Sequence, residues 1–322
     1  MSDLRRGIIG QPQTNGGGGE DYNPNYLTIY ALENGLELSV YLTKTNTELS
    51  YSFDNGDTWE DVTDGYILLS NINSGETVAF KGELTGSAPC MFFIDKYCNI
   101  MGNCNSLLFG NDAANNNDLT GYDGCFSYLF AYNNSIVDAS KLVLPATTLA
   151  NNCYNSMFQG CTSLTTAPEL PATTLAKYCY NSMFSGCTSL VIAPELPATN
   201  LADRCYDSMF CGCSSLTTAP ELPATTLADG CYDRMFEMCT SLTTAPELPA
   251  TTLADGCYSM MFYNCGKLNY IKMLATDISV PDCLNMWVEG VSPTGTFVKN
   301  KNATWNKTGD DGIPSRWTVL TE

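Results

Sequence analysis

A 26-residue repeat constrains the fold of this chain more than any other feature. The motif LPATTLAxxCYxSMFxGCTSLTTAPE recurs almost unchanged between Leu144 and about Leu274. Its period is marked by Pro145, Pro171, Pro197, Pro223 and Pro249. A fixed period of roughly 20 to 50 residues is typical of stacked units that bury their apolar faces against one another. The sequence therefore predicts a solenoid, in which each repeat forms one coil.

Each repeat divides into two halves with different patterns. Residues 227–239 place apolar side chains four apart, which favours the inner face of a short helix. Residues 242–248 are Thr-rich and extended, as is typical of a strand in a parallel sheet. We therefore expect an α+β fold with one short strand and one short helix per coil, and an array on the order of 34 Å long.

The apolar columns of the repeat define a predicted structural core. It comprises two cysteine columns and one methionine column: Cys153, Cys179, Cys205, Cys231, Cys257; Cys161, Cys187, Cys213, Cys239, Cys265; Met157, Met183, Met209, Met235 and Met261. Stacking at about 4.8 Å per coil would allow disulfides within a column. Because free cysteine is a small and commonly buried residue, we predict reduced core thiols. The Cx7C spacing differs from the CxxC pattern of closed zinc sites, so we predict no metal and no cofactor.

The segment GCTSLTxxxxLP followed by CYxxMF resembles the BspA-like leucine-rich-repeat family of bacterial surface proteins, over about residues 125–290. The resemblance implies a leucine-rich-repeat solenoid and a role in adhesion to host proteins or surfaces. The chain departs from the family in its longer period and in four prolines within the expected strand: Pro168, Pro194, Pro220 and Pro246. Each proline removes a backbone donor. In the last coil Lys272 replaces this proline, and that coil fits the LxxLxL template better.

Changes in composition predict four further segments around the solenoid at 125–290. Residues 1–25 indicate a flexible Gly-rich tail, or an attachment peptide anchored by Leu4, Ile8 and Ile9. Residues 26–87 indicate a small antiparallel β-sandwich, because short alternating runs are separated by turn pairs such as Asn34-Gly35. Residues 88–124 indicate an Asn-rich linker and N-terminal cap, and 291–322 a C-terminal β-hairpin cap.

Residues 52–59, SFDNGDTW, match the SxDxGxTW pattern and so resemble the Asp-box of sialidase propellers. The resemblance implies a hairpin that is locked by side-chain hydrogen bonds to the backbone, with the tryptophan packed beneath it. A single copy without an arginine cluster does not indicate a glycosidase. Asp54 and Asp57 provide too few oxygen ligands for calcium.

Composition excludes several classes of function. Lys and Arg total 15 against 34 Asp and Glu, so a net charge of -19 would repel nucleic acid and anionic membranes. The chain contains no histidine, which removes the commonest general base and metal ligand. We therefore predict a non-enzymatic protein without catalytic residues.

The N-terminus carries Arg5 and Arg6 but only a short apolar run at 7–10, so no secretory signal is visible. No apolar stretch is long enough to cross a membrane, and we expect no membrane insertion. Either a secretory signal peptide has been removed and another N-terminal sequence stands in its place, or the protein reaches its location without the general secretion route. We expect a cell-surface or extracellular location, with virion association as the alternative.

The strand-bearing surface of the repeats is the predicted binding face. One exposed row comprises Thr166, Ile192, Thr218, Thr244 and Tyr270, next to Lys272. A second row comprises Glu169, Glu195, Glu221 and Glu247. Threonine hydroxyls could bond sugar or peptide, or simply reflect β-propensity. Stacked carboxylates repel one another, which suggests a basic partner or loosely held cations.

These observations favour a recognition or adhesion protein that binds a cell-surface protein or glycan through the repeat array. The alternative is a phage tail-fibre or tip protein with a receptor-binding role. That alternative predicts a trimer, whereas the sequence of a surface protein leaves the oligomeric state open. A glycoside hydrolase would need paired carboxylates in a cleft, and the regular carboxylates here form a row.

Overall fold

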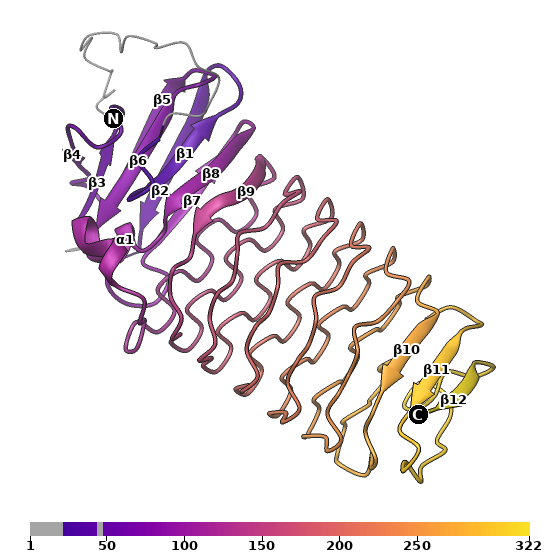
Figure 1. Cartoon of the computed structure of the whole chain (residues 1–322). Coiled ribbons are helices and arrows are strands. Elements are labelled where there is room, and N and C mark those ends of the chain that lie inside the picture. Colours follow the sequence, from indigo (N-terminus) through magenta and orange to yellow (C-terminus); the bar gives the residue numbers. More distant parts are fainter. Residues whose placement is uncertain (1–21, 44–47) are drawn as a thin grey trace.

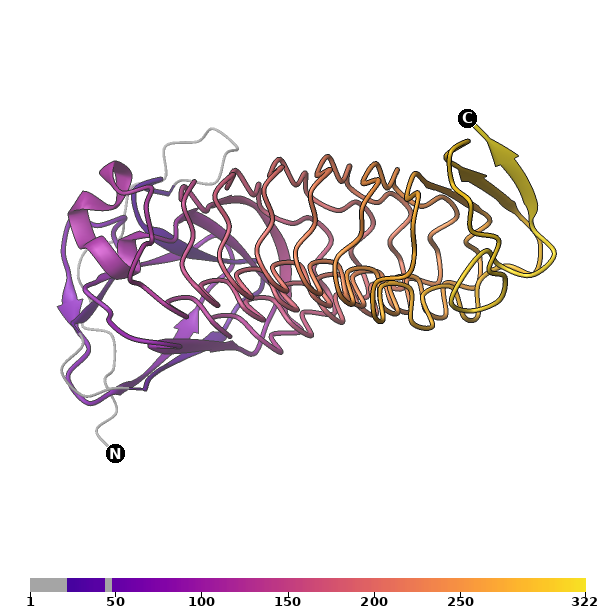
Figure 2. The same ribbon diagram turned by 90° about the horizontal axis from the view of Figure 1, so that it is seen from below.

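A computed structural model describes residues 22–43 and 48–322 (Figure 1). The predicted tail, apart from its last four residues, and its anchors Leu4, Ile8 and Ile9 lie outside the described residues. The described chain is elongated, with two β-sheets at one end, a stack of irregular coils, and a small sheet at the other end (Figures 1 and 2).

The first part of the chain forms two sheets. Their strands are β1 (Leu27–Ala31), β2 (Leu36–Leu42), β3 (Leu49–Ser52), β4 (Glu60–Asp61), β5 (Tyr66–Ile72), β6 (Thr77–Gly82), β7 (Cys90–Ile94), β8 (Cys98–Asn103) and β9 (Ile136–Val143). One sheet has the order β4-β3-β6-β1-β8-β9 and the other β5-β2-β7. Phe80 and Phe92, one from each sheet, meet with ring centroids 5.0 Å apart. The alternating sequence pattern thus produces two sheets that share an apolar interior.

The segment 88–124, which we interpreted as a linker and cap, contributes β7 and β8 to these sheets. It continues into helix α1 (Ser106–Phe109) and the 3-10 helix η1 (Gly110–Asn115). β8 then pairs in parallel with β9, which belongs to the first coil of the repeat array. The two parts of the molecule therefore share one continuous sheet.

The Asp-box segment forms the expected locked hairpin between β3 and β4. The Ser52 hydroxyl accepts a hydrogen bond from Gly56 N–H at 2.9 Å, and Asp54 Oδ1 accepts one from Thr58 N–H at 2.9 Å. Trp59 donates to the Gly56 carbonyl at 3.0 Å and packs edge-on against Tyr26. The segment is therefore structural, because its polar groups are used within the hairpin.

The predicted α+β fold, a leucine-rich-repeat solenoid with a strand and a helix in each coil, is wrong: the described residues contain many strands but a single short α-helix, Ser106–Phe109. Residues 144–269, all of them described, contain no helix and no strand longer than a single bridge. Successive repeats form irregular coils that lie side by side (Figures 1 and 2). Backbone hydrogen bonds between equivalent segments join these coils.

The half-repeat expected to be helical is a ladder of turns. Met157 N–H donates to the Tyr154 carbonyl at 3.2 Å, within the same coil, whereas Phe158 N–H donates to Met183 in the next coil at 2.9 Å. This alternation continues through residues 153–161. Both the local turn and the stacking of coils are therefore fixed by the backbone.

Left-handed residues are the reason why no helix forms. Asn152, Ser156 and Gly160 have φ of 54°, 55° and 71°, and the equivalent positions of the next four coils are also positive. A right-handed helix excludes such residues. The apolar spacing is four residues, which on an α-helix of 3.6 residues per turn would drift by about 40° per step.

Prolines explain why the expected strand is missing. The strands β9 and β10 (Tyr270–Met273) contain no proline, and Lys272 occupies the proline position in β10. Between them the Thr-rich segments make only single parallel bridges, such as Ile192 with Thr218 and Thr244 with Tyr270. The missing N–H of each proline prevents a bridge from extending into a ladder.

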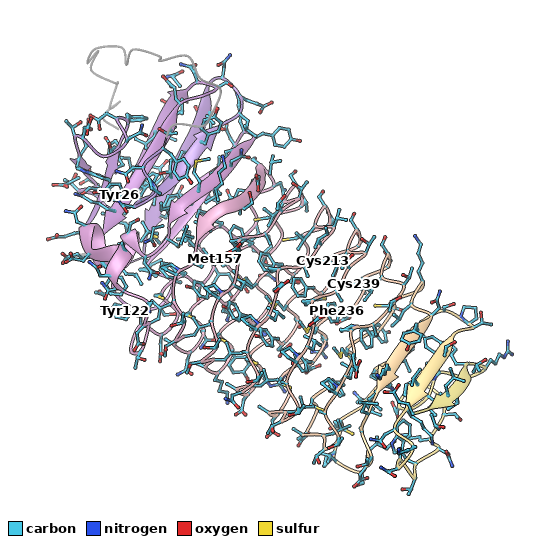
Figure 3. The ribbon with its side chains drawn as sticks, viewed as in Figure 1. Tyr26, Tyr122, Met157, Cys213, Phe236 and Cys239 are labelled. Carbon is cyan, nitrogen blue, oxygen red and sulfur yellow. The ribbon has the colours of Figure 1, made fainter. Side chains whose placement is uncertain are left out.

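The interior of the stack consists of residue columns. All the predicted core cysteines and methionines have an exposed fraction of 0%. Tyrosine and phenylalanine columns accompany them, for example Tyr180 over Tyr206 and Phe184 over Phe210, at centroid distances of 5.7 and 5.8 Å. Figure 3 shows Met157 and Cys213 within the stack. Since each coil repeats the same side chains, every coil covers its neighbour with the same surface.

The last segment closes the stack with a three-stranded sheet, in the order β10-β11-β12. Strands β11 (Thr296–Lys299) and β12 (Thr318–Thr321) run parallel to one another, rather than as the hairpin expected for 291–322. The indole N–H of Trp287 donates to Gly312 at 2.8 Å, and that of Trp317 donates to Ser292 at 2.8 Å. These tryptophans cover the final coil.

Candidate functional site

The predicted Thr row lies on the surface of the stack. Thr166, Ile192, Thr218 and Thr244 are exposed, and Tyr270 is half-buried in β10. The side chain of Ile192 is 63% exposed, and the neighbouring Val191 is 43% exposed. This coil therefore presents two apolar side chains where the coils on either side present threonines.

The four glutamates of the second row, Glu169, Glu195, Glu221 and Glu247, are also exposed. Lys272 lies at the end of this row and pairs with Glu247 at 3.1 Å and with Glu322 at 2.6 Å. Hydrogen bonds to these two carboxylates raise the pKa of Lys272, those with Glu322 most. The lysine that we expected to face a ligand is therefore occupied by carboxylates of its own chain.

An open groove of about 530 Å³ lies where the β-sheets meet the first coils. We call the part of the chain that forms the strands β1 to β8 the sheet domain. The walls of the groove are Leu32, Glu33 and Tyr97 from the sheet domain, and Val137, Ser163 and Ser189 from the coils. We define these six residues as the junction groove. Ser189 lies three residues before Ile192, so the groove opens beside the coil with the exposed apolar pair. Ligand sites occur preferentially at such domain junctions.

Hydrogen bonds between two turns, from both backbone and side-chain groups, hold the sheet-domain wall of the groove. Leu32 N–H donates to the Tyr97 carbonyl at 3.0 Å, and Tyr97 N–H donates to Glu33 Oε2 at 3.2 Å. Lys96 Nζ donates to the Asn34 carbonyl at 2.9 Å, beside Gly35 at φ 69°. The side chain of Tyr97 is 49% exposed on this fixed frame. The wall thus offers an aromatic ring and a carboxylate in a defined position.

Sequence reasoning missed the sheet-domain half of this groove. Leu32 and Glu33 precede the Asn34-Gly35 turn, and Tyr97 lies in the segment interpreted as a linker. The Asn34-Gly35 pair was the one sequence signal near these residues. It predicted a tight turn, but it did not indicate that the turn would lie next to Tyr97. Ile192 was included in the predicted row, but its difference from threonine was not used.

The cysteine columns lie in the interior and do not form a site. All sixteen cysteines are free thiols. Burial raises the pKa of Cys161 and Cys265 to about 12, which keeps these thiols protonated. Cys211 is half-buried, and desolvation and the nearby Glu237 raise its pKa to about 11. The protonated thiol is a weak nucleophile and a poor metal ligand.

One partly buried charge cluster crosses two coils, with Asp207 and Asp233 buried and Arg204 partly exposed. Arg204 donates to Asp207 at 2.9 Å and to Asp233 at 3.2 Å. Desolvation, then the charge of Asp207, raises the pKa of Asp233. Within residues 22–43 and 48–322, no three acidic or cysteine side chains are arranged to hold a metal ion. The cluster instead links neighbouring coils through a shared guanidinium.

No protein-family model, curated protein or solved structure matches the chain in these comparisons. Among the described residues, no helix has the length and apolarity required to cross a lipid bilayer. The groove and the exposed rows are therefore interpreted from their own geometry.

Proposed function

We propose that this chain is a non-enzymatic recognition protein that binds a cell-surface protein or glycan. The binding surface comprises the junction groove and the adjoining exposed row around Ile192. The repeat motif resembles that of BspA-like surface proteins in sequence but not in fold, and this sequence resemblance is the reason for proposing this class of partner. The observation that carries the proposal is the groove itself, in which apolar, aromatic, hydroxyl and carboxylate groups from two parts of the chain converge.

The chemistry of the groove suits a neutral or basic partner. Tyr97 and Leu32 provide exposed apolar surface, and Ser163 and Ser189 provide hydroxyl groups. Glu33 and the overall charge of -19 disfavour an anionic partner. The repeated coils provide a regular support, because the ladder of turns in each coil is hydrogen-bonded to that of the next.

Binding of the full chain to immobilised fibronectin, laminin and a glycan array would test the proposal. The diagnostic variants are Tyr97→Ala and Ile192→Thr, the second of which introduces the residue found at this position in the coils on either side. We expect each to weaken binding about tenfold, because an interface depends on a few central contacts. Tyr132→Ala is the matched control, since Tyr132 is 64% exposed outside the groove. Equal binding by all variants, or no binding to any probe, would contradict the proposal.

A further inference from the structure

The outer face of the small sheet β5-β2-β7 carries a second exposed apolar surface. It comprises Ser39 and Tyr41 of β2, Tyr66 and Leu68 of β5, and Met91 and Phe93 of β7. We define these six residues as the aromatic face. Tyr41, Tyr66, Leu68 and Phe93 are 40–44% exposed, and none of them belongs to the junction groove.

Strand register brings these six side chains into two adjacent rows. Tyr41 pairs with Tyr66 on one side and with Met91 on the other, and Ser39 pairs with Leu68 and with Phe93. The ring of Tyr41 contacts that of Tyr66 at 4.6 Å and that of Phe93 at 5.4 Å. The plane of the Tyr41 ring is tilted by 47° from that of Tyr66 and by 87° from that of Phe93, so the three rings are contiguous but their faces point in different directions.

Ser39 has the shortest side chain of the set and lies between longer neighbours. Its hydroxyl is 3.4 Å from the hydroxyl of Tyr66. The second row therefore has a short polar side chain at its centre, between Leu68 and Phe93, with the Tyr66 hydroxyl beside it. Such a surface offers apolar contacts at its rim and hydrogen-bonding groups within it.

Alternation along the strands shows that this apolar character is not required by the core. The opposite side chains Val40, Ile67 and Phe92 are buried and already provide the interior face. Outward positions of an antiparallel sheet with one solvated face are usually polar. An exposed apolar patch on such a face commonly marks a site of interaction.

The size of the aromatic face argues against a protein partner. An aromatic side chain has about 150–250 Å² of surface to bury. The four side chains that are 40–44% exposed therefore offer on the order of 300 Å² in total. A standard protein interface needs about 800 Å² per partner. The available area instead matches a few units of a small or chain-like ligand.

Charge restricts the ligand further. None of the six residues is charged, and the next row along the sheet carries Glu37 and Asp95, whose carboxylate accepts Glu37 N–H at 2.7 Å. With a net charge of -19, an anionic ligand would be repelled. The combination of exposed rings, hydroxyl groups and an acidic border suits a neutral ligand that has both apolar C–H faces and hydroxyls.

We propose that the aromatic face binds neutral carbohydrate chains, independently of the junction groove. A sugar ring stacks through its C–H groups on the face of Tyr41 or on that of Phe93, whose planes are 87° apart, and sugar hydroxyls bond to Ser39 and Tyr66. The carbohydrate would lie on the side of the sheet opposite to the buried side chains Val40, Ile67 and Phe92.

Affinity electrophoresis of the full chain tests this inference, in native gels that contain laminarin, galactomannan or amylopectin, with heparin as the anionic control. We expect at least one neutral polysaccharide to retard the wild-type protein, and heparin to have no effect. Tyr41→Ala and Phe93→Ala should each reduce the retardation at least tenfold. Tyr132→Ala, at an exposed aromatic outside the face, should leave it unchanged.

A second variant protects the test against misfolding. Ser39→Leu keeps every apolar group of the face, but it removes the central hydroxyl and adds bulk beside the Tyr66 hydroxyl, so it should also abolish retardation. No retardation by any neutral polysaccharide, or equal retardation of all variants, would overturn the inference. It would also be overturned if light scattering showed an oligomer that Phe93→Ala dissociates, since the face would then join copies of the chain. Variants of the junction groove should retain polysaccharide binding, which separates this test from that of the proposed function.

Discussion

The thiol of Cys239 donates to the carbonyl oxygen of Phe210 at 3.2 Å, across the boundary between two coils. The same carbonyl also accepts Cys213 N–H at 3.0 Å. Every cysteine of this column makes the equivalent bond: Cys161, Cys187, Cys213 and Cys265 donate to Phe130, Phe158, Phe184 and Phe236. The cysteine is therefore a small buried donor that links adjacent coils where water is excluded.

Substitution of Cys239 by alanine should destabilise the protein. The variant loses the inter-coil bond and leaves a small void, and we expect a loss of about 1–2 kcal/mol in the free energy of unfolding. Urea unfolding measures the change. Cys211→Ala is the matched control, because Cys211 is half-buried and lies outside the column, and it should change stability by less than about 0.5 kcal/mol. A loss of less than about 0.5 kcal/mol for Cys239→Ala would show that the thiol bond contributes nothing.

Thiol titration should find every cysteine reduced. Burial and raised pKa values protect the columns, so the native protein should react slowly with a disulfide reagent such as DTNB. After denaturation without reductant, the same reagent should count sixteen thiols. Fewer than sixteen thiols in protein purified without reductant, but sixteen after reduction, would reveal disulfides between stacked cysteines and contradict the prediction.

Acid should weaken the hairpin that carries the Asp-box. Desolvation opposes ionisation of Asp54, but hydrogen bonds from Ser52 and Thr58 outweigh it and lower the pKa of the carboxyl. A lowered pKa contributes stability above the unfolded value of about 4, and this contribution is lost as pH falls through the folded value. The melting temperature of the wild-type protein should therefore fall more steeply than that of Asp54→Asn between about pH 5 and pH 3. Parallel curves would rule out this role for Asp54.

Whole coils should be removable, because each bonds to its neighbours through equivalent groups. Deletion of residues 196–221 joins Glu195 to Leu222 and preserves the repeat sequence. This variant should unfold cooperatively and be shorter by about 5 Å in solution scattering. Deletion of residues 196–208, half a repeat, should abolish cooperative unfolding. Similar behaviour of the two deletions would contradict the equivalence of the coils.

The sequence was sufficient to identify the period, the buried columns and most strands of the sheet domain. The helix was predicted wrongly because apolar residues at Cys231 and Met235 match both a helix and a ladder of four-residue turns. The distinguishing signals were the unvarying spacing of four and the glycines at Gly160, Gly186 and Gly212, which tolerate positive φ. The apolar pattern taken alone does not distinguish a helix from a ladder of turns.

The groove could not have been predicted from local sequence. Glu33 and Tyr97 are joined by a hydrogen bond across 64 residues, and Ser163 comes from a different part of the fold. Such contacts depend on how β8 continues into β9 and so orients the coils against the sheet domain. By contrast, the hydrogen bonds of the Asp-box link residues no more than four apart and were predictable from the motif.

The ladder of turns is tested most directly by whether a glycine substitution raises or lowers the free energy of unfolding. Met238 has a φ of 59°, is 45% exposed, and occupies the position of Gly212, whose φ is 73°. Because a left-handed residue other than glycine costs about 1–2 kcal/mol, Met238→Gly should raise the free energy of unfolding by about 0.5–1 kcal/mol, and Gly212→Ala should lower it by about 1 kcal/mol. In a helix the signs reverse, since glycine there is about 1 kcal/mol less favourable than other residues. Urea unfolding in which Met238→Gly is the more stable protein would support the ladder of turns, and a loss of about 1 kcal/mol would contradict it.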